Sequence, residues 1–211
     1  MPQQASSAPD SHAVVFDVNV YLDLGRLLGP GITLHDVQSA GAEYTSEPLP
    51  SSKPCVDSLR AICVCLGGVF AEPQLLQVWT STHIDDTLTH VAQQPVAAGG
   101  LGWTSAQATS LLADVVDELA YARTAGGHVV LNGVDGGHAL DHEDAMVYTT
   151  ARKAAFDDNS VLYRYLVTND QQFRNAPGLD HINIAFPHEF VDAVRTARRQ
   201  VALARMPRPK P

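Results

Sequence analysis

The stretch LDHEDAMVYTTARKAAFDDNSVLYRYLVTND, Leu140 to Asp170, combines a helix with a strand, and acids adjoin both. A helical pattern runs over Asp141–Phe156, and the apolar run Tyr165–Thr168 is typical of a buried strand. Acids open the helix, and Asp170 lies just beyond the strand, after Asn169. A helix leading into a buried strand is typical of α/β proteins, so this stretch indicates the fold class.

In the rest of the chain, predicted strands also alternate with predicted helices. Further strands are predicted at Val14–Phe16, Leu76–Thr80, His128–Leu131 and Asn183–Phe186. Helices are predicted at Asn19–Leu28, at Asp57–Leu66, near His83, from Thr104 or Ser105 to Gly126, and from Pro187. Residues 31–53 and the Gly-rich loop Gln93–Trp103 are predicted to be irregular. The pattern predicts an α/β fold, a three-layer α/β/α sandwich with a mostly parallel central sheet.

Length and composition fit one domain, because 211 residues with 45% apolar and 18% charged side chains form a substantial core. We divide the chain into a flexible leader (1–12), a single domain (13–194), and a basic helix end with a Pro-rich tail (195–211). The leader lacks the features of a signal peptide, and no apolar run reaches the roughly 18 residues of a membrane span. The three cysteines suit neither a disulfide framework nor a zinc site, so we expect a reducing cytoplasmic location.

Charge is distributed unevenly along the chain. The net charge is −9, yet the last seventeen residues carry six basic side chains and no acid, which leaves −15 on residues 1–194. One interpretation is that the basic tail binds a polyanion or an acidic partner. The other is that basic side chains are favoured at the C-terminal end of a helix, because the helix dipole is negative there. Both interpretations stay open.

Four short segments place acids where an α/β fold gathers side chains. They are VVFDVN (Val14–Asn19), STHIDD (Ser81–Asp86), DHEDA (Asp141–Ala145) and YLVTND (Tyr165–Asp170). In open parallel sheets, sites form at the carboxyl ends of the strands. Gathered acids repel one another, and the usual compensation is a divalent cation such as Mg²⁺ or Mn²⁺ held by oxygen ligands. Taken singly, each acid also has a structural explanation as a helix cap or turn residue.

Together these segments resemble the PIN-domain ribonucleases, over most of residues 13–190. The motifs are DVNVYLD after the first strand, TSTHIDD at a strand-to-helix junction, LDHEDAMVYTTA, and LVTNDQQF. The most specific is the DxxDAxxxxxA helix followed by VTNDxxF. The resemblance is closest to the bacterial toxins of toxin–antitoxin pairs, although the segments after the first helix and at Gln93–Trp103 are longer than a minimal toxin needs. It implies an endoribonuclease whose acids bind Mg²⁺ or Mn²⁺.

The resemblance also implies roles for individual residues. The implied catalytic acids are Asp17, Asp86, Asp144 and Asp170, and the implied metal ligands are Asp17, Asp86, Asp141, Asp144 and Asp170. For the second acid, Asp85 and Asp86 are both candidates, and Asp86 is chosen because it reaches the cleft if the helix begins at His83 and Ile84. Asn19, Thr168 and Asn169 are expected to orient these acids or the attacking water through hydrogen bonds.

A cation held by these acids lowers the pKa of a bound water and neutralises charge on the phosphate. The expected partners are an RNA substrate and an antitoxin or other protein, with a homodimer left open. Basic candidates for holding RNA are Arg26, Arg152, Lys153 and Arg174.

Two other classes of function stay open. A phosphatase of the haloacid dehalogenase type also begins with an apolar strand that ends in Asp, but it needs a second Asp where this chain has Asn19. A PIN-like binding module without activity is the other alternative. Metal-dependent RNA cleavage distinguishes the nuclease from the module, and preference for a small phosphate ester identifies the phosphatase.

Overall fold

The computed structural model describes residues 10–134, 140–156, 158, 160–179 and 182–206. The strands are β1 (Ser11–Phe16), β2 (Val69–Ala71), β3 (Gln74–Ser81), β4 (Gly127–Val129), β5 (Val161–Val167) and β6 (Asn183–Ala185). The helices are α1 (Val18–Leu28), α2 (Leu34–Glu43), α3 (Pro54–Cys65), α4 (Thr82–Gln93), η1 (Val96–Ala98), α5 (Ser105–Leu111) continued by the π-helical η2 (Leu112–Arg123), α6 (His142–Lys153), α7 (Gln171–Asn175) and α8 (Pro187–Arg205).

The strands form a single mostly parallel sheet. Its order is β2-β3-β1-β5-β6, and β4 pairs with the carboxyl half of β3. The β2–β3 pair is antiparallel, and the other described pairs are parallel. The predicted α/β class with a mostly parallel sheet is therefore confirmed.

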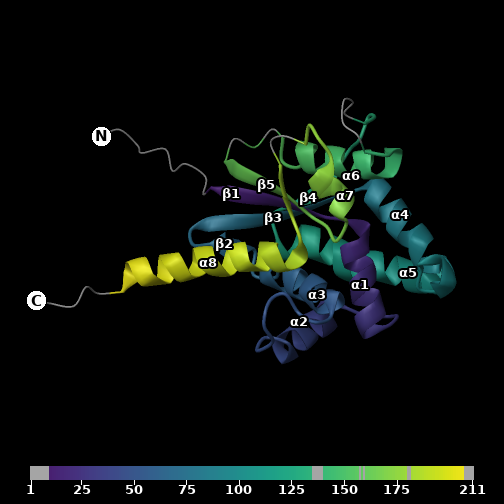
Figure 1. Ribbon diagram of the computed structural model, residues 1–211, viewed down its shortest axis with the longest axis horizontal. Coiled ribbons are helices and arrows are strands. Elements are labelled where there is room, and N and C mark those ends of the chain that lie inside the picture. The colour runs from purple at the N-terminus through teal and green to yellow at the C-terminus, as the bar shows by residue number, and fades with distance from the viewer. Residues whose placement is uncertain (1–9, 135–139, 157, 159, 180–181, 207–211) are drawn as a thin grey trace, which may run out of the picture.

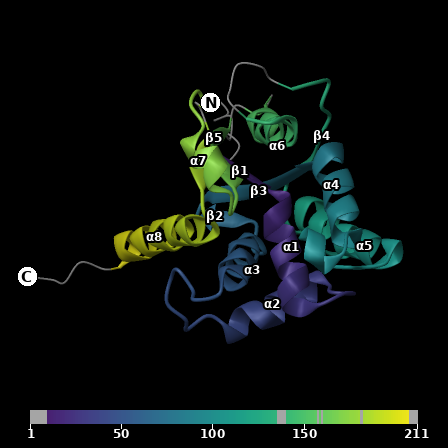
Figure 2. The same cartoon turned by 45° about the vertical axis from the view of Figure 1, so that its right-hand side comes forward.

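The central strand β1 is buried along its whole length, as a continuous apolar run predicts for a strand covered on both faces. Both ribbon views place α6 on one side of the sheet and α1, α3 and α8 on the other (Figures 1 and 2). Phe16 of β1 packs edge-to-face against Tyr21 of α1 and Phe190 of α8. Helices α1 and α8 are therefore packed against the sheet where its central strand β1 ends.

The prediction of an irregular segment over residues 31–53 is wrong, because α2 forms within it. A capping box begins this helix: Thr33 Oγ1 accepts a hydrogen bond from the Asp36 N–H (3.3 Å), and Asp36 accepts one from the Thr33 N–H (2.9 Å). The strand β2 and the helix α7 were also not predicted, since three and five residues are too few to show a periodic pattern. The other predicted helices and strands are present with shifted ends.

The last helix, α8, runs through the boundary drawn at residues 194 and 195 and ends at Arg205. Its first half packs through the fully buried Val191 and Val194. Arg198 then donates hydrogen bonds to the backbone carbonyls of Val64, Val69 and Phe70, so the basic part of the helix is attached to α3 and β2. The helix end then extends beyond the body of the molecule (Figure 1).

Two predicted segments fall partly outside the described residues. These are residues 1–9 of the leader and residues 207–211 of the tail. The strand β1 already begins at Ser11, within the range assigned to the leader. Across the described part of the chain, no helix is long and apolar enough to cross a membrane.

Candidate functional site

Asp17 lies at the carboxyl end of β1, where it begins α1 as the N-terminal capping residue. Its N–H donates to the Val167 carbonyl at the end of β5 (2.9 Å), so the ends of the two central strands are tied together. Its side chain is 7% exposed, and one carboxylate oxygen accepts hydrogen bonds from Thr168 Oγ1 (2.6 Å) and Asn19 Nδ2 (2.5 Å). Thr168 and Asn19 therefore hold the Asp17 carboxylate in one orientation.

Asp170 and Asp144 approach Asp17 from two other elements. Asp170 follows β5, and its N–H donates to Thr168 Oγ1 (2.9 Å), the same hydroxyl that binds Asp17. Asp144 lies in the first turn of α6, and its N–H donates to the carboxylate of Asp141 (2.9 Å), which caps that helix. Local helix caps thus place acids at the edge of the sheet where β1 and β5 end.

Burial and the repulsion of neighbouring acids raise the pKa values of Asp17 and Asp144. Desolvation is the largest cause of the rise in the pKa of Asp17 to about 6, and the charges of Asp170 and Glu143 add to it. Desolvation also leads the rise in the pKa of Asp144 to about 7, followed by the charges of Asp141, Asp17, Asp170 and Glu143. Asp17, Asp144 and Asp170 therefore act on one another across one site. We call these three the carboxylate cluster.

Glu143 also raises pKa values in the carboxylate cluster, and sequence reasoning did not identify it as part of the site. It is exposed on the first turn of α6, yet its charge raises the pKa of both Asp17 and Asp144. Its position next to Asp144 in the HEDA segment was the available signal. On a helix, neighbouring residues point roughly 100° apart, so Glu143 and Asp144 do not share one direction on α6.

The structure corrects the choice of Asp86 as the second acid. Asp86 is exposed, whereas Asp85 is half-buried and accepts a hydrogen bond from Thr80 Oγ1 (2.6 Å). His128 Nε2 lies 3.3 Å from the other oxygen of Asp85. The helix α4 begins at Thr82, one residue earlier than assumed, so that Asp85 and not Asp86 points inward.

Asp85 belongs to a separate group of charges. Its pKa is raised chiefly by burial and further by Asp117 on η2, while Thr80 and His128 lower it. The charges that raise the pKa of Asp17 and Asp144 come, within the described residues, from the carboxylate cluster itself, Asp141 and Glu143. Neither Asp85 nor Asp86 is therefore brought into the carboxylate cluster.

The donor chemistry of the cluster fits a hard divalent cation, because carboxylate oxygens are the ligands that Mg²⁺ and Mn²⁺ prefer. Asp141 and Asp170 each direct one oxygen to a helix N–H, and a carboxylate retains a second oxygen for an ion. In the described part of the chain, no three His, Cys, Asp or Glu side chains are placed closely enough to hold a metal. Binding one requires the acids to converge further than they do here.

A partly buried polar network adjoins the cluster. Asn169 Nδ2 donates to Asp23 (2.8 Å) and to Ser58 Oγ (3.0 Å), and Ser58 also donates to Asp23 (2.7 Å). The Asn169 N–H donates to Asn19 Oδ1 (3.1 Å), which connects this network to Asp17. Sequence reasoning missed Asp23, although an acid one turn further along DVNVYLD from Asn19 was the available signal.

This network borders a cavity of about 460 Å³ that Asn19, Asp23, Arg26 and Asn169 help to line. Arg26 is paired with Asp23 (2.9 Å). The cavity is of a size that small ligands occupy, and it lies directly beside the residues that position Asp17.

The other basic candidates lie elsewhere. Arg174 is paired with Glu189 (2.9 Å) and stands over the Phe186 ring at 4.7 Å. Arg152 and Lys153, at the end of α6, line a different cavity of about 860 Å³.

Comparison of the chain with models of known protein families, with curated proteins and with solved structures finds no match in any of the three.

The raised pKa values predict how stability depends on pH in the metal-free protein. Because the folded protein holds protons on Asp17 and Asp144 that the unfolded chain has released, stability should increase as the pH falls through about 7 and 6. Asp17 alone should add about 1–2 kcal/mol to the free energy of unfolding between about pH 8 and about pH 5. Urea unfolding in EDTA at several pH values measures this.

The Asp144→Asn variant is the control for this prediction. It removes the group whose pKa is raised to about 7, so its stability should rise less on acidification. An identical pH dependence in the wild type and the variant would contradict the assignment.

Proposed function

We propose that this protein is a metal-dependent nuclease that hydrolyses RNA phosphodiester bonds, with a PIN-like three-layer α/β/α fold. One observation carries the proposal: the buried Asp17 and the half-buried Asp144 and Asp170 come from three different elements and act on one another at the carboxyl edge of the sheet. A protein gains no stability from bringing acids together, since their repulsion and desolvation both disfavour the folded state. Such a cluster is typical of a cation site.

The residues have distinct roles in this proposal. Asp17, Asp144 and Asp170 would hold Mg²⁺ or Mn²⁺, with Asp141 beside them at the start of α6. Thr168 contacts both Asp17 and the Asp170 backbone, so it sets the separation of these two acids. A bound divalent ion supplies a water of lowered pKa and neutralises charge that grows on the phosphate.

Asn19 and Asn169 also help to position the Asp17 carboxylate. Asn19 donates to the Asp17 carboxylate and accepts from the Asn169 backbone, which fixes how Asp17 presents its oxygens. This use of Asn19 as a donor supports the nuclease over the phosphatase alternative. A phosphatase of that type needs an acid at the same position, and an amide there cannot donate a proton to a leaving group.

The proposal extends to the partners. The substrate would be RNA, and a cytoplasmic toxin of this kind would be restrained by an antitoxin or other protein partner. The motif resemblance supports this extension.

The direct test is cleavage of a labelled single-stranded RNA by the purified full-length chain in Mg²⁺ or Mn²⁺. Fragments should appear with metal, disappear with excess EDTA and return when metal is restored, because the cluster carries the ion that the chemistry needs. Hydrolysis of p-nitrophenyl phosphate without RNA cleavage would instead identify a phosphatase. No cleavage in either metal would contradict the nuclease proposal.

A further inference from the structure

A second cavity, of about 480 Å³, shares no lining residue with the cavity beside the carboxylate cluster. Its walls come from α2, α3, η2 and α8. Four arginines line it together with two uncharged polar residues, namely Arg60, Arg123, Arg195, Arg198, Gln38 and Thr45. We call it the arginine pocket.

The charge balance of the arginine pocket is opposite to that of the protein. The whole chain has a net charge of −9, yet no carboxylate is found among the described residues that line this cavity. Cys63 also lines it, but burial raises the pKa of its thiol to about 11, so that it stays neutral. The lining therefore presents positive charge without an internal counter-charge.

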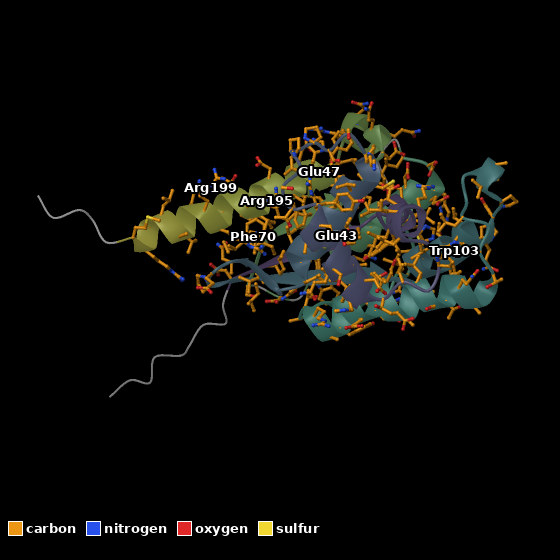
Figure 3. The ribbon with its side chains drawn as sticks, turned by 90° about the horizontal axis from the view of Figure 1, so that it is seen from below. Glu43, Glu47, Phe70, Trp103, Arg195 and Arg199 are labelled. Atoms are coloured by element: carbon orange, nitrogen blue, oxygen red, sulfur yellow. The ribbon has the colours of Figure 1, made fainter. Side chains whose placement is uncertain are left out.

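Two of the four arginines have carboxylate partners outside the lining. Arg123 pairs with Glu118 at 3.0 Å, and Arg60 lies 3.6 Å from Asp57. Arg198 is held by backbone carbonyls, which orient its guanidinium without neutralising it. For Arg195, the described part of the chain provides no ion pair or side-chain hydrogen bond. Figure 3 shows Arg195 and Arg199 along α8, beside the body of the molecule.

Arg60 is the buried arginine of this pocket, and its guanidinium donates to the backbone carbonyls of Tyr44, Glu47 and Pro48. It is 2% exposed, and its Nε, buried from solvent, has no hydrogen-bond partner within the described residues. An unpartnered donor on a buried cation is unfavourable, because it has lost water without gaining an acceptor. Because Asp57 already balances the Arg60 charge, the positive charge left for a ligand comes from Arg195 and Arg198.

We propose that the arginine pocket binds a phosphate-bearing ligand. Guanidinium groups bind phosphate oxygens in a bidentate manner, and several of them together match a group with more than one negative charge. The cavity is large enough for a diphosphate or for part of a nucleotide. The phosphate would come either from a free polyphosphate compound or from the backbone of an RNA strand. The inference does not depend on the nuclease proposal.

Titration calorimetry of the full-length chain with inorganic pyrophosphate tests the proposal. EDTA is present, so that no cation links the ligand to the carboxylate cluster. We expect saturable binding at one site. Arg195→Gln should weaken it by about tenfold or more, because one charge-assisted contact with phosphate is lost.

Arg199→Gln is the matched control. It removes the same charge one turn further along α8, from an exposed residue that does not line the pocket. Its affinity for pyrophosphate should stay within about threefold of the wild type, since only screened long-range attraction changes. Equal losses in the two variants, or no saturable binding by the wild type, would overturn the proposal.

Competition then identifies the source of the phosphate. If RNA supplies it, a short single-stranded RNA displaces pyrophosphate, and Arg195→Gln weakens both ligands. If a free compound supplies it, a nucleoside triphosphate displaces pyrophosphate, whereas the RNA does not. Neither outcome depends on cleavage, so a failure here is distinguishable from a failure of the nuclease proposal.

Discussion

Replacement of Asp144 by asparagine is expected to reduce metal-dependent RNA cleavage by about a thousandfold while the fold is kept. The amide is nearly the same size as the carboxylate, but it carries no charge with which to hold Mg²⁺ or Mn²⁺. Asp144 is the best position for this change, because its pKa responds to Asp17 and to Asp170. Single-turnover cleavage of a labelled RNA at saturating metal measures the effect.

Asp86→Asn is the matched control for this experiment. It makes the same chemical change at the exposed acid of α4 that the sequence had placed in the site. Its cleavage rate should stay within about twofold of the wild type, as expected for a surface residue. Wild-type activity of Asp144→Asn at saturating metal would show that the carboxylate cluster does not catalyse.

The stability of the Asp144→Asn variant shows whether a loss of cleavage is catalytic or results from a folding defect. Without metal at about pH 8, Asp144→Asn should be at least as stable as the wild type, because it removes a charge that repels Asp17, Asp141 and Asp170. Thermal unfolding in EDTA checks this. Lost cleavage together with clearly lowered stability would mean that the variant reports on folding instead of on chemistry.

Replacement of Gly126 by alanine is expected to lower the free energy of unfolding by more than about 3 kcal/mol. A Cβ atom at Gly126 would overlap the backbone carbonyl oxygen of Val78 and would lie 2.5 Å from its carbonyl carbon. Both atoms belong to β3, so no side-chain rotation can relieve the overlap, and β4 has to move away from the sheet. Urea unfolding followed by circular dichroism measures the loss.

Gly67→Ala is the corresponding control. It lies just after α3, and a Cβ atom there would meet nothing within 4 Å. Its stability should stay within about 0.5 kcal/mol of the wild type. A Gly126→Ala protein as stable as the Gly67→Ala protein would contradict the close approach of this segment to β3.

Local sequence patterns were sufficient for most of the secondary structure. The apolar run before Asp17 and the run before Asn169 predicted the two central strands, because a strand buried on both faces needs apolar side chains at successive positions. The capping position of Asp141 could be predicted for the same kind of reason, since a helix start needs an acceptor within one turn. The positions of Asp17, Asp144 and Asp170 beside strand ends and a helix start were thus predicted from residues close to them in the chain.

The phase of a helix was harder to predict. Asp85 and Asp86 are neighbours in sequence, yet α4 begins one residue earlier than predicted, and Asp85 is half-buried while Asp86 is exposed. Hydrophobic periodicity locates a helix better than it locates its first residue, because several residues near Ser81 are compatible with a capping role.

The sequence by itself determined the α/β alternation and the acids at the ends of its strands, because those features depend on residues that are near one another in the chain. Only the tertiary structure decided which distant groups meet. Asp23 reaches Asn169 across 146 positions, and the arginine pocket joins Arg60 of α3 to Arg195 of α8. Such proximity arises from how helices pack on the sheet, and periodicity within one segment carries no information about its neighbours in space.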